Sequence, residues 1–78
     1  MHIPDKSYKL VLSSSMESRE LEFMDVSMDQ IGKSILAMVQ RGKQIYQKTR
    51  RPVKVILYSS ANGEYKRFSS WNFGVKQK

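Results

Sequence analysis

The second half of the chain combines aromatic rings with positive charge. Residues 30–78 contain eleven lysines and arginines against one acid, a net charge of +10, whereas residues 1–29 contain six acids against three bases, a net charge of −3. Aromatic rings stack on nucleobases and cationic side chains hold phosphates, so this mixture is typical of surfaces that bind nucleic acid. The aromatic residues of this half are Tyr46, Tyr58, Tyr65, Phe68, Trp71 and Phe73.

No arrangement of residues indicates catalysis or a metal site. His2 is the only histidine, and no nucleophile is placed near it, so we expect an ordinary surface residue. Four acids between residues 17 and 25 offer oxygen ligands, but alternation along a strand places Glu20 and Glu22 on one face and Asp25 on the other. The absence of cysteine excludes disulfides and zinc–thiolate sites. We therefore expect a non-enzymatic protein without a cofactor.

The chain is expected to fold as one domain over residues 1–78. Its core should be thin, because so short a chain buries only about 60% of its unfolded surface. The longest apolar runs, 35–39 and 55–58, are far shorter than the ~20 residues of a membrane span. The N-terminal residues lack the apolar core of a signal peptide, and a secreted domain of this size usually carries disulfides. We expect a cytoplasmic protein without a membrane partner.

One amphipathic helix is predicted between residues 28 and 47. Ser27 is a suitable N-cap, and Gln30 three residues later completes a capping box. Gly42 lies within the apolar stripe, which indicates close approach of the helix to a sheet. Pro52 ends the helical segment, because the residue before a proline avoids helical angles. The stripe comprises Met28, Ile31, Ile35, Met38, Val39, Gly42 and Tyr46.

Two hairpins flank this helix. Alternation of apolar and polar residues predicts two strands within 8–26, joined by a serine-rich loop. After the helix, the β-branched segment 53–58 predicts a strand, and Asn62-Gly63 predicts a type I′ turn into a return strand over 65–71. The order of elements is therefore ββαββ.

This order predicts an α+β fold, a four-stranded antiparallel sheet with one helix packed on one face. The two strands joined through the helix run parallel and should cross over right-handedly, and the first strand fits between them. The predicted sheet order is 2-1-3-4. Because one helix covers only one sheet face, the opposite face is expected to be uncovered.

The predicted turn also fixes the register of the last hairpin. Counting back from it pairs Leu57 with Phe68 and Lys54 with Trp71. Phe68 is thereby assigned to the core beneath the helix, and Trp71 to the uncovered face. The predicted core of the sheet comprises Tyr8, Leu10, Leu12, Leu21, Phe23, Val53, Val55, Leu57 and Phe68.

The uncovered face is the first candidate site, a platform on which single-stranded nucleic acid would stack. Tyr58, Tyr65 and Trp71 would supply the rings, while Lys54 and Arg67 would contact phosphates. A second group of bases follows the end of the helix. It would contact phosphate too, although the helix dipole favours cations there in any case. This group comprises Lys43, Lys48, Arg50 and Arg51, followed by Lys54.

The same face also suits a protein partner. Val11, Met24 and Ile56 are assigned to it, and apolar groups on an uncovered sheet face fit a homodimer. Glu20 and Glu22 lie there as well and would repel phosphates, and cross-strand pairs stabilise hairpins without any ligand. Two hypotheses therefore stand. One is a nucleic-acid-binding or nucleic-acid-complex accessory protein, and the other is a protein-interaction module or inhibitor that dimerises or caps a partner.

Overall fold

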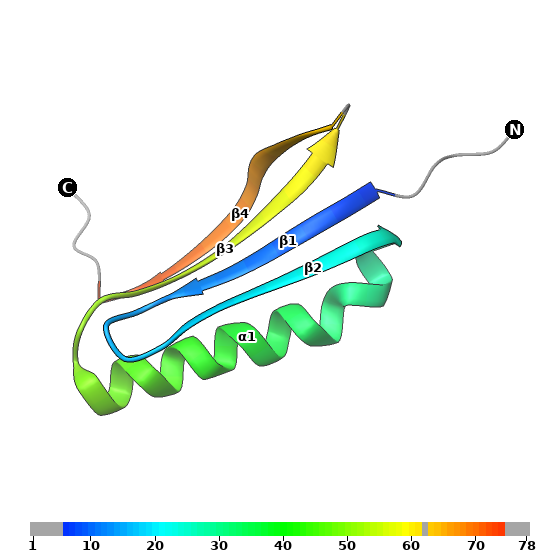
Figure 1. Cartoon of the computed structure of the whole chain (residues 1–78). Coiled ribbons are helices and arrows are strands. Elements are labelled where there is room, and N and C mark those ends of the chain that lie inside the picture. The colour runs from blue at the N-terminus through cyan, green and yellow to red at the C-terminus, as the bar shows by residue number, and fades with distance from the viewer. Residues whose placement is uncertain (1–5, 62, 75–78) are drawn as a thin grey trace, which may run out of the picture.

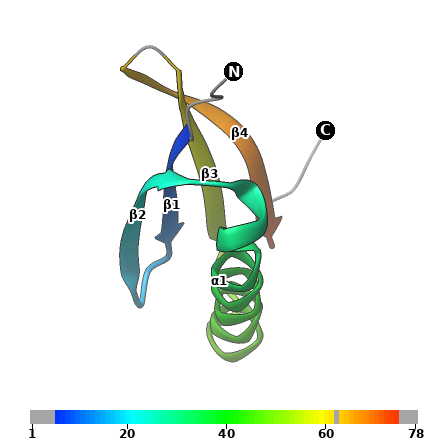
Figure 2. The same cartoon turned by 90° about the vertical axis from the view of Figure 1, so that its right-hand side faces the viewer.

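The computed structural model describes residues 6–61 and 63–74, which form the predicted ββαββ arrangement. Its elements are β1 (Lys6–Ser13), β2 (Ser18–Val26), α1 (Met28–Thr49), β3 (Val53–Ala61) and β4 (Glu64–Phe73). The strands form one antiparallel sheet in the order β2-β1-β3-β4, and α1 packs on one of its faces (Figures 1 and 2). The predicted fold and sheet order are confirmed. Within these residues, no helix is long and apolar enough to cross a membrane.

Local signals determine both ends of α1. Before its first turn, the backbone N–H of Ser27 donates to Gln30 Oε1 (2.7 Å), as expected of a capping box. The helix continues to Thr49, beyond the predicted end at 47, and Arg50 then adopts a left-handed conformation with a φ of 59°. The Arg50 N–H donates to the Tyr46 carbonyl (2.7 Å), which satisfies one of the helix-end acceptors.

The predicted close approach at Gly42 is confirmed. A Cβ atom at this position would lie 3.1 Å from Val55 Cγ2 and 3.3 Å from atoms of both Val53 and Phe73. The absence of a side chain therefore lets α1 pack directly against β3 and β4. As a result, the helix lies nearer to β3 than to β2 (Figure 2).

The buried core lies between α1 and the two central strands. Its members come from alternate positions of β1 and β3 and from one side of α1. Leu21 of β2, predicted in the core, is instead 42% exposed, because α1 lies nearer to β3. A recess of about 170 Å³ remains between Leu21 and the helix. The buried apolar residues are Tyr8, Leu10, Leu12, Ile31, Met38, Ile45, Val53, Val55 and Leu57.

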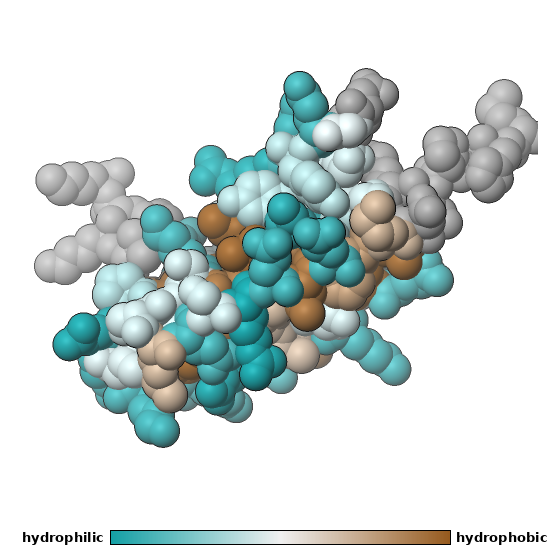
Figure 3. All heavy atoms as spheres, in the orientation of Figure 1, coloured by the Kyte–Doolittle hydropathy of each residue, from teal (hydrophilic) through white to brown (hydrophobic). Residues whose placement is uncertain are grey.

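Several large apolar and aromatic side chains remain on the surface. Figure 3 shows apolar patches that interrupt an otherwise hydrophilic exterior across the middle of the molecule. A single helix on a four-stranded sheet offers too little surface to cover all of them. The exposed members are Met16, Leu21, Met24, Leu36, Tyr65 and Phe68.

The β3–β4 hairpin keeps the predicted register only near its turn. Tyr58 pairs with Arg67, as predicted from the turn. The register then shifts by one residue, so that Leu57 pairs with Ser69 and Phe68 is left as the extra residue of a β-bulge. Because side chains alternate between the two sheet faces, this shift moves every later residue of β4 to the face opposite its predicted one.

The bulge exchanges the predicted environments of two aromatic residues. Phe68, predicted in the core, is 59% exposed. Trp71, predicted on the uncovered face, pairs with Val55 and packs against the core together with Phe73. Both predictions are wrong for the same reason. Without the bulge, Phe68, Ser70 and Asn72 would face the helix in place of Ser69, Trp71 and Phe73. Burial of the two aromatic side chains Trp71 and Phe73 stabilises the fold more than burial of Phe68 alone.

The other outer strand carries a bulge as well. Tyr8 pairs with Phe23, but Lys6 pairs with Val26, so β2 contains an extra residue just before α1. The shift allows Val26 to pack against the core. The β1–β3 pairing is regular, and both irregular strands lie at edges, where bulges hinder pairing with another sheet.

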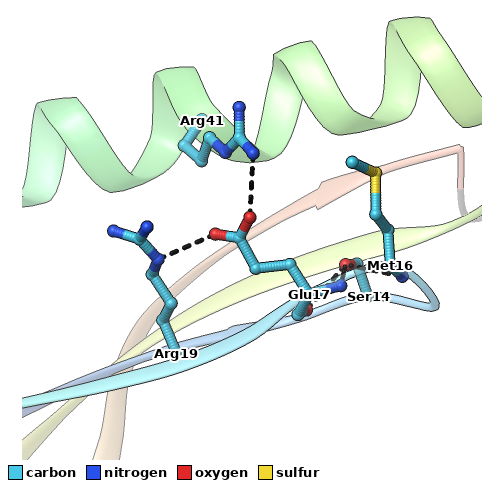
Figure 4. Close-up of polar contacts among 5 residues, drawn as sticks. All are labelled: Ser14, Met16, Glu17, Arg19 and Arg41. Atoms are coloured by element: carbon cyan, nitrogen blue, oxygen red, sulfur yellow. Dashed lines mark hydrogen bonds and ion pairs between the residues drawn. The ribbon is translucent and has the colours of Figure 1, made fainter.

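An ion-pair cluster ties the β1–β2 loop to α1 (Figure 4). Arg41 Nη2 donates to Glu17 Oε1 (2.8 Å), and Arg19 Nε lies 2.8 Å from Glu17 Oε2. The Ser14 hydroxyl accepts from the Glu17 N–H (2.9 Å) and donates to the Glu17 carbonyl (2.7 Å), which orders the loop. The hydrogen bond from Arg41 holds the pKa of Glu17 below its usual value, against the opposing effect of burial. Glu17 therefore connects loop and helix.

Candidate nucleic-acid interface

The sheet face turned away from α1, called the open face below, is covered by no element between residues 6 and 74 that the structure describes (Figure 2). Alternation along the strands places Lys9 and Val11 of β1 on this face, because Leu10 and Leu12 point into the core. Their partners on β3 share the face: Lys9 pairs with Tyr58, and Val11 with Ile56.

Two tyrosines and two bases meet on the open face. Lys9 pairs with Tyr58 across β1 and β3, and Tyr58 pairs with Arg67 across β3 and β4. Tyr65 lies two residues before Arg67 on β4, and Lys9 Nζ lies 4.8 Å from the centroid of its ring. That separation is a cation–π contact. The predicted residues Tyr58, Tyr65 and Arg67 are therefore neighbours, with Lys9 among them.

A recess of about 340 Å³ opens between these side chains. Lys9 and Glu20 approach each other there, with 3.9 Å between Nζ and Oε2. This distance is too long for a hydrogen bond. The N–H donors of the Lys9 ammonium and the acceptors of the Glu20 carboxylate therefore remain available for other hydrogen bonds. The recess is lined by Lys9, Val11, Glu20, Tyr58 and Tyr65.

The sign of the charge changes across the open face. Glu20 and Glu22 belong to β2, where they pair with Val11 and Lys9, and β2 forms one edge of the sheet. Arg67 belongs to β4, which forms the opposite edge. A polyanion is therefore repelled at the β2 edge and attracted at the β4 edge.

Three further predicted bases lie at the other end of β3. Lys54 pairs with Ser13 on β1 and Asn72 on β4, which places it on the open face about 13 Å along β3 from Tyr58. Arg50 and Arg51 are exposed and directly precede β3. These three bases extend the positive charge of the open face toward the end of α1.

The last two predicted bases are not brought together with the tyrosines. Lys43 and Lys48 are exposed residues of α1, which packs on the opposite side of the sheet. They flank the side of the helix that faces the sheet, about 100–120° from Gly42 at helical spacing. A ligand on the open face would reach them only by passing around an edge of the sheet.

The structure differs from the sequence-based prediction of the site at two residues. Trp71 was predicted on the wrong face, and Lys9 was not predicted as a site residue. Trp71 was predicted as the third stacking ring, but it packs beneath the sheet against the core. Lys9 was not among the predicted site residues, although alternation identifies it. It lies between Tyr8 and Leu10, both buried, so its side chain must point to the other face.

Some features of the sequence lie outside the described residues. His2, Asn62 of the predicted turn and the C-terminal Lys76 and Lys78 belong to this group, and the side chain of Asp25 is likewise not described. Among the side chains that the structure describes, no three acidic or histidine groups converge as metal ligands.

No family model, curated protein or solved structure matches the chain. The function of the open face must therefore be inferred from its own geometry and charge.

Proposed function

We propose that the chain is a small, non-enzymatic protein that binds single-stranded nucleic acid through the open face, alone or as an accessory to a larger nucleic-acid complex. The observation that carries this proposal is the meeting of Tyr58, Tyr65, Arg67 and Lys9 on one uncovered sheet surface. Stacking on an aromatic side chain is worth about 1–3 kcal/mol per base, and neighbouring cations hold the backbone. Open antiparallel sheets with aromatic side chains bind single strands in this way.

The distribution of charge favours a path for the strand along β3 and β4. Arg67 lies at one end of this path, and Lys54, Arg50 and Arg51 lie at the other. The acids of the open face belong to β2, on the far side of β1. A strand that follows β3 and β4 keeps its phosphates beside the bases and away from the acids.

The test is fluorescence anisotropy of a labelled, mixed-sequence oligonucleotide, prepared as DNA and as RNA, over a range of salt concentrations. A label is needed because Trp71 packs against the core and does not report stacking on the open face. We expect log affinity to fall by about 0.7 per log unit of salt for each phosphate contacted. Arg67→Gln should reduce this slope by about 0.7.

The matched control is Lys33→Gln, which removes an exposed base of α1 on the other side of the sheet and should leave the slope unchanged. Absence of binding to both strand types at low salt would overturn the proposal. An equal effect of the two substitutions would overturn the assignment of binding to the open face.

A second candidate function is a homodimer formed through the open face, and the opposite charges of the two sheet edges favour it. A two-fold axis parallel to the strands would place β2 of one copy against β4 of the other, so that Glu20 and Glu22 approach the partner's Arg67. Light scattering after size exclusion separates the candidates. A salt-resistant dimer that excludes the oligonucleotide favours the homodimer, and a monomer that binds the oligonucleotide favours the first proposal.

A further inference from the structure

Phosphate binding by the open face does not explain why an acid, Glu20, lies on that face. An acid on a surface that attracts a polyanion weakens the attraction, yet Glu20 lines the recess that both tyrosines share. Its ion pair with Lys9 leaves hydrogen-bonding capacity on both groups, and the Glu20 side chain is 53% exposed. A ligand bound in the recess would therefore meet a carboxylate that can accept hydrogen bonds from it.

We propose that the recess accepts a guanine base of the bound single strand, with Glu20 accepting hydrogen bonds from the base and Lys9 donating one to it. This inference rests on the proposed function and adds a base preference to it. The volume of about 340 Å³ is within the range of small-molecule sites, about 300–1,000 Å³. The rings of Tyr58 and Tyr65 line the recess and supply the stacking surface.

The Watson–Crick edge of guanine matches the charged pair in the recess. Guanine presents two adjacent donors, N1–H and N2–H, followed by the acceptor O6. A carboxylate has only acceptors and receives two parallel donors in a bidentate manner, while an ammonium group has only donors. Glu20 suits the first two groups and Lys9 suits the third.

The other bases offer no such pair of donors to a carboxylate. Adenine and cytosine each place a ring-nitrogen acceptor beside their amino group, and thymine and uracil have one N–H between two carbonyl oxygens. A carboxylate that receives one donor from any of these bases faces an acceptor lone pair with its second oxygen, which is repulsive. The donor–acceptor pattern therefore selects guanine.

The lysine is held in place before the base arrives. Lys9 Nζ lies 4.8 Å from the centre of the Tyr65 ring and 3.9 Å from Glu20 Oε2, and the Lys9 side chain is only 28% exposed. Contacts on two sides restrict the ammonium to the wall of the recess, so less conformational entropy is lost when it donates to a base.

The test compares oligothymidine strands that carry a single central guanine, adenine, cytosine or inosine, measured by anisotropy with the full chain. We expect the guanine strand to bind about tenfold more tightly than unsubstituted oligothymidine. Inosine lacks the N2 amino group and should lose most of this advantage. The same comparison in RNA, with oligouridine as the background, distinguishes the two backbones.

Glu20→Gln and Glu22→Gln provide the matched pair of variants. Each removes one acid from the open side of β2, so each should raise the affinity for plain oligothymidine slightly. Only Glu20→Gln should abolish the preference for guanine, because the glutamine amide turns a donor toward the donors of the base. Equal affinity for all strands, or a guanine preference that survives in Glu20→Gln, would overturn the inference while leaving the proposed function standing.

Two other outcomes separate the proposals further. No binding of any oligonucleotide would overturn both the proposed function and this inference. Guanosine monophosphate used as a competitor should displace the strand only at a large excess, because it lacks the contacts of the backbone with Arg67 and Lys54. Competition at concentrations equal to those of the oligonucleotide would instead assign the recess to a free nucleotide.

Discussion

The two ends of the β3–β4 hairpin obey different constraints. Near Gly63, whose φ is 82°, the strands follow the register of the turn and the side chains of β4 are exposed. Near α1, the register is shifted by one residue, and Val53 and Val55 have no exposed surface. Turn geometry and core packing thus require different registers of the same two strands, and the bulge at Phe68 satisfies both.

The same division separates stability from the proposed binding. The α1 end of the hairpin buries Trp71 and Phe73 against the core, so substitutions there should act on folding. The turn end contributes Tyr65 and Arg67 to the open face, where little of the core depends on them. Substitutions at the two ends of one strand should therefore have separable effects.

The strongest test of this division compares alanine substitutions of two aromatic residues of β4, Trp71 and Tyr65. Trp71→Ala should lower the free energy of unfolding by about 2–3 kcal/mol, somewhat less than truncation of a fully buried tryptophan. Tyr65→Ala should lower it by less than about 1 kcal/mol, the usual range of a cross-strand contact. Urea denaturation followed by circular dichroism measures both, because it does not depend on the tryptophan.

Oligonucleotide binding should show the reverse order. Tyr65→Ala removes a wall of the recess and should weaken binding, whereas folded Trp71→Ala should bind as the parent protein does. If Trp71→Ala impairs binding without affecting stability, the bulge does not place Trp71 beneath the sheet and the predicted register without a bulge is restored.

The fold was predictable because its local signals agree with one another and with a general rule of sheet topology. Ser27 and Gln30 cap the helix, alternation marks the strands, and a right-handed crossover determines the sheet order. The register of β4 beyond Arg67 was not predictable from the turn. It depends on the packing of Trp71 and Phe73 against the core, where Phe73 lies beside Gly42 of α1, a contact between segments distant in sequence.

The sheet face of a predicted site residue was predicted correctly where the register came from the turn. Tyr58, Tyr65 and Arg67 lie before the bulge and share the open face as expected. Trp71 lies beyond it and was assigned to the wrong face. The alternation of β1 is enough to place Lys9 on the open face, but Lys9 belongs to the acidic half of the chain, and the site was predicted from the basic half.

An effect of intermediate size on stability is expected when the two glycines of α1, Gly32 and Gly42, are substituted. Comparison of the two substitutions measures the contribution of packing at the α1 end of the hairpin. Gly32 is exposed, and a Cβ atom there would meet nothing within 4 Å. Gly32→Ala should therefore stabilise the fold by about 0.5–1 kcal/mol through helix propensity. Gly42→Ala gains the same propensity, but its methyl group would crowd three side chains of β3 and β4 at 3.1–3.3 Å.

We expect Gly42→Ala to be at least about 1 kcal/mol less stable than Gly32→Ala, measured by urea denaturation with Trp71 fluorescence. Both substitutions change the unfolded chain in the same way, so the difference between them isolates packing. Equal stabilisation by both would mean that α1 moves away from β3 at little cost, and that close packing at Gly42 does not stabilise the fold.

The smallest effect concerns Glu17, which ties the β1–β2 loop to α1 through Arg41. The hydrogen bond from Arg41 lowers the pKa of Glu17 in the folded protein, so the folded state binds a proton less readily than the unfolded state. The resulting stabilisation is present above the unfolded pKa of about 4.3 and is lost as the pH falls through the lower folded value. Glu17→Gln should remove this part of the pH dependence.

Urea midpoints at pH 7 and pH 3 measure the effect. The parent protein should lose more stability than Glu17→Gln between the two pH values, because the variant never had the charged contact. Glu22→Gln is the matched control, since Glu22 makes no ion pair with any described residue. If Glu17→Gln and Glu22→Gln respond to acid alike, the contact with Arg41 in Figure 4 contributes nothing to the folded state in solution, and the packing of α1 on the sheet positions the helix without it.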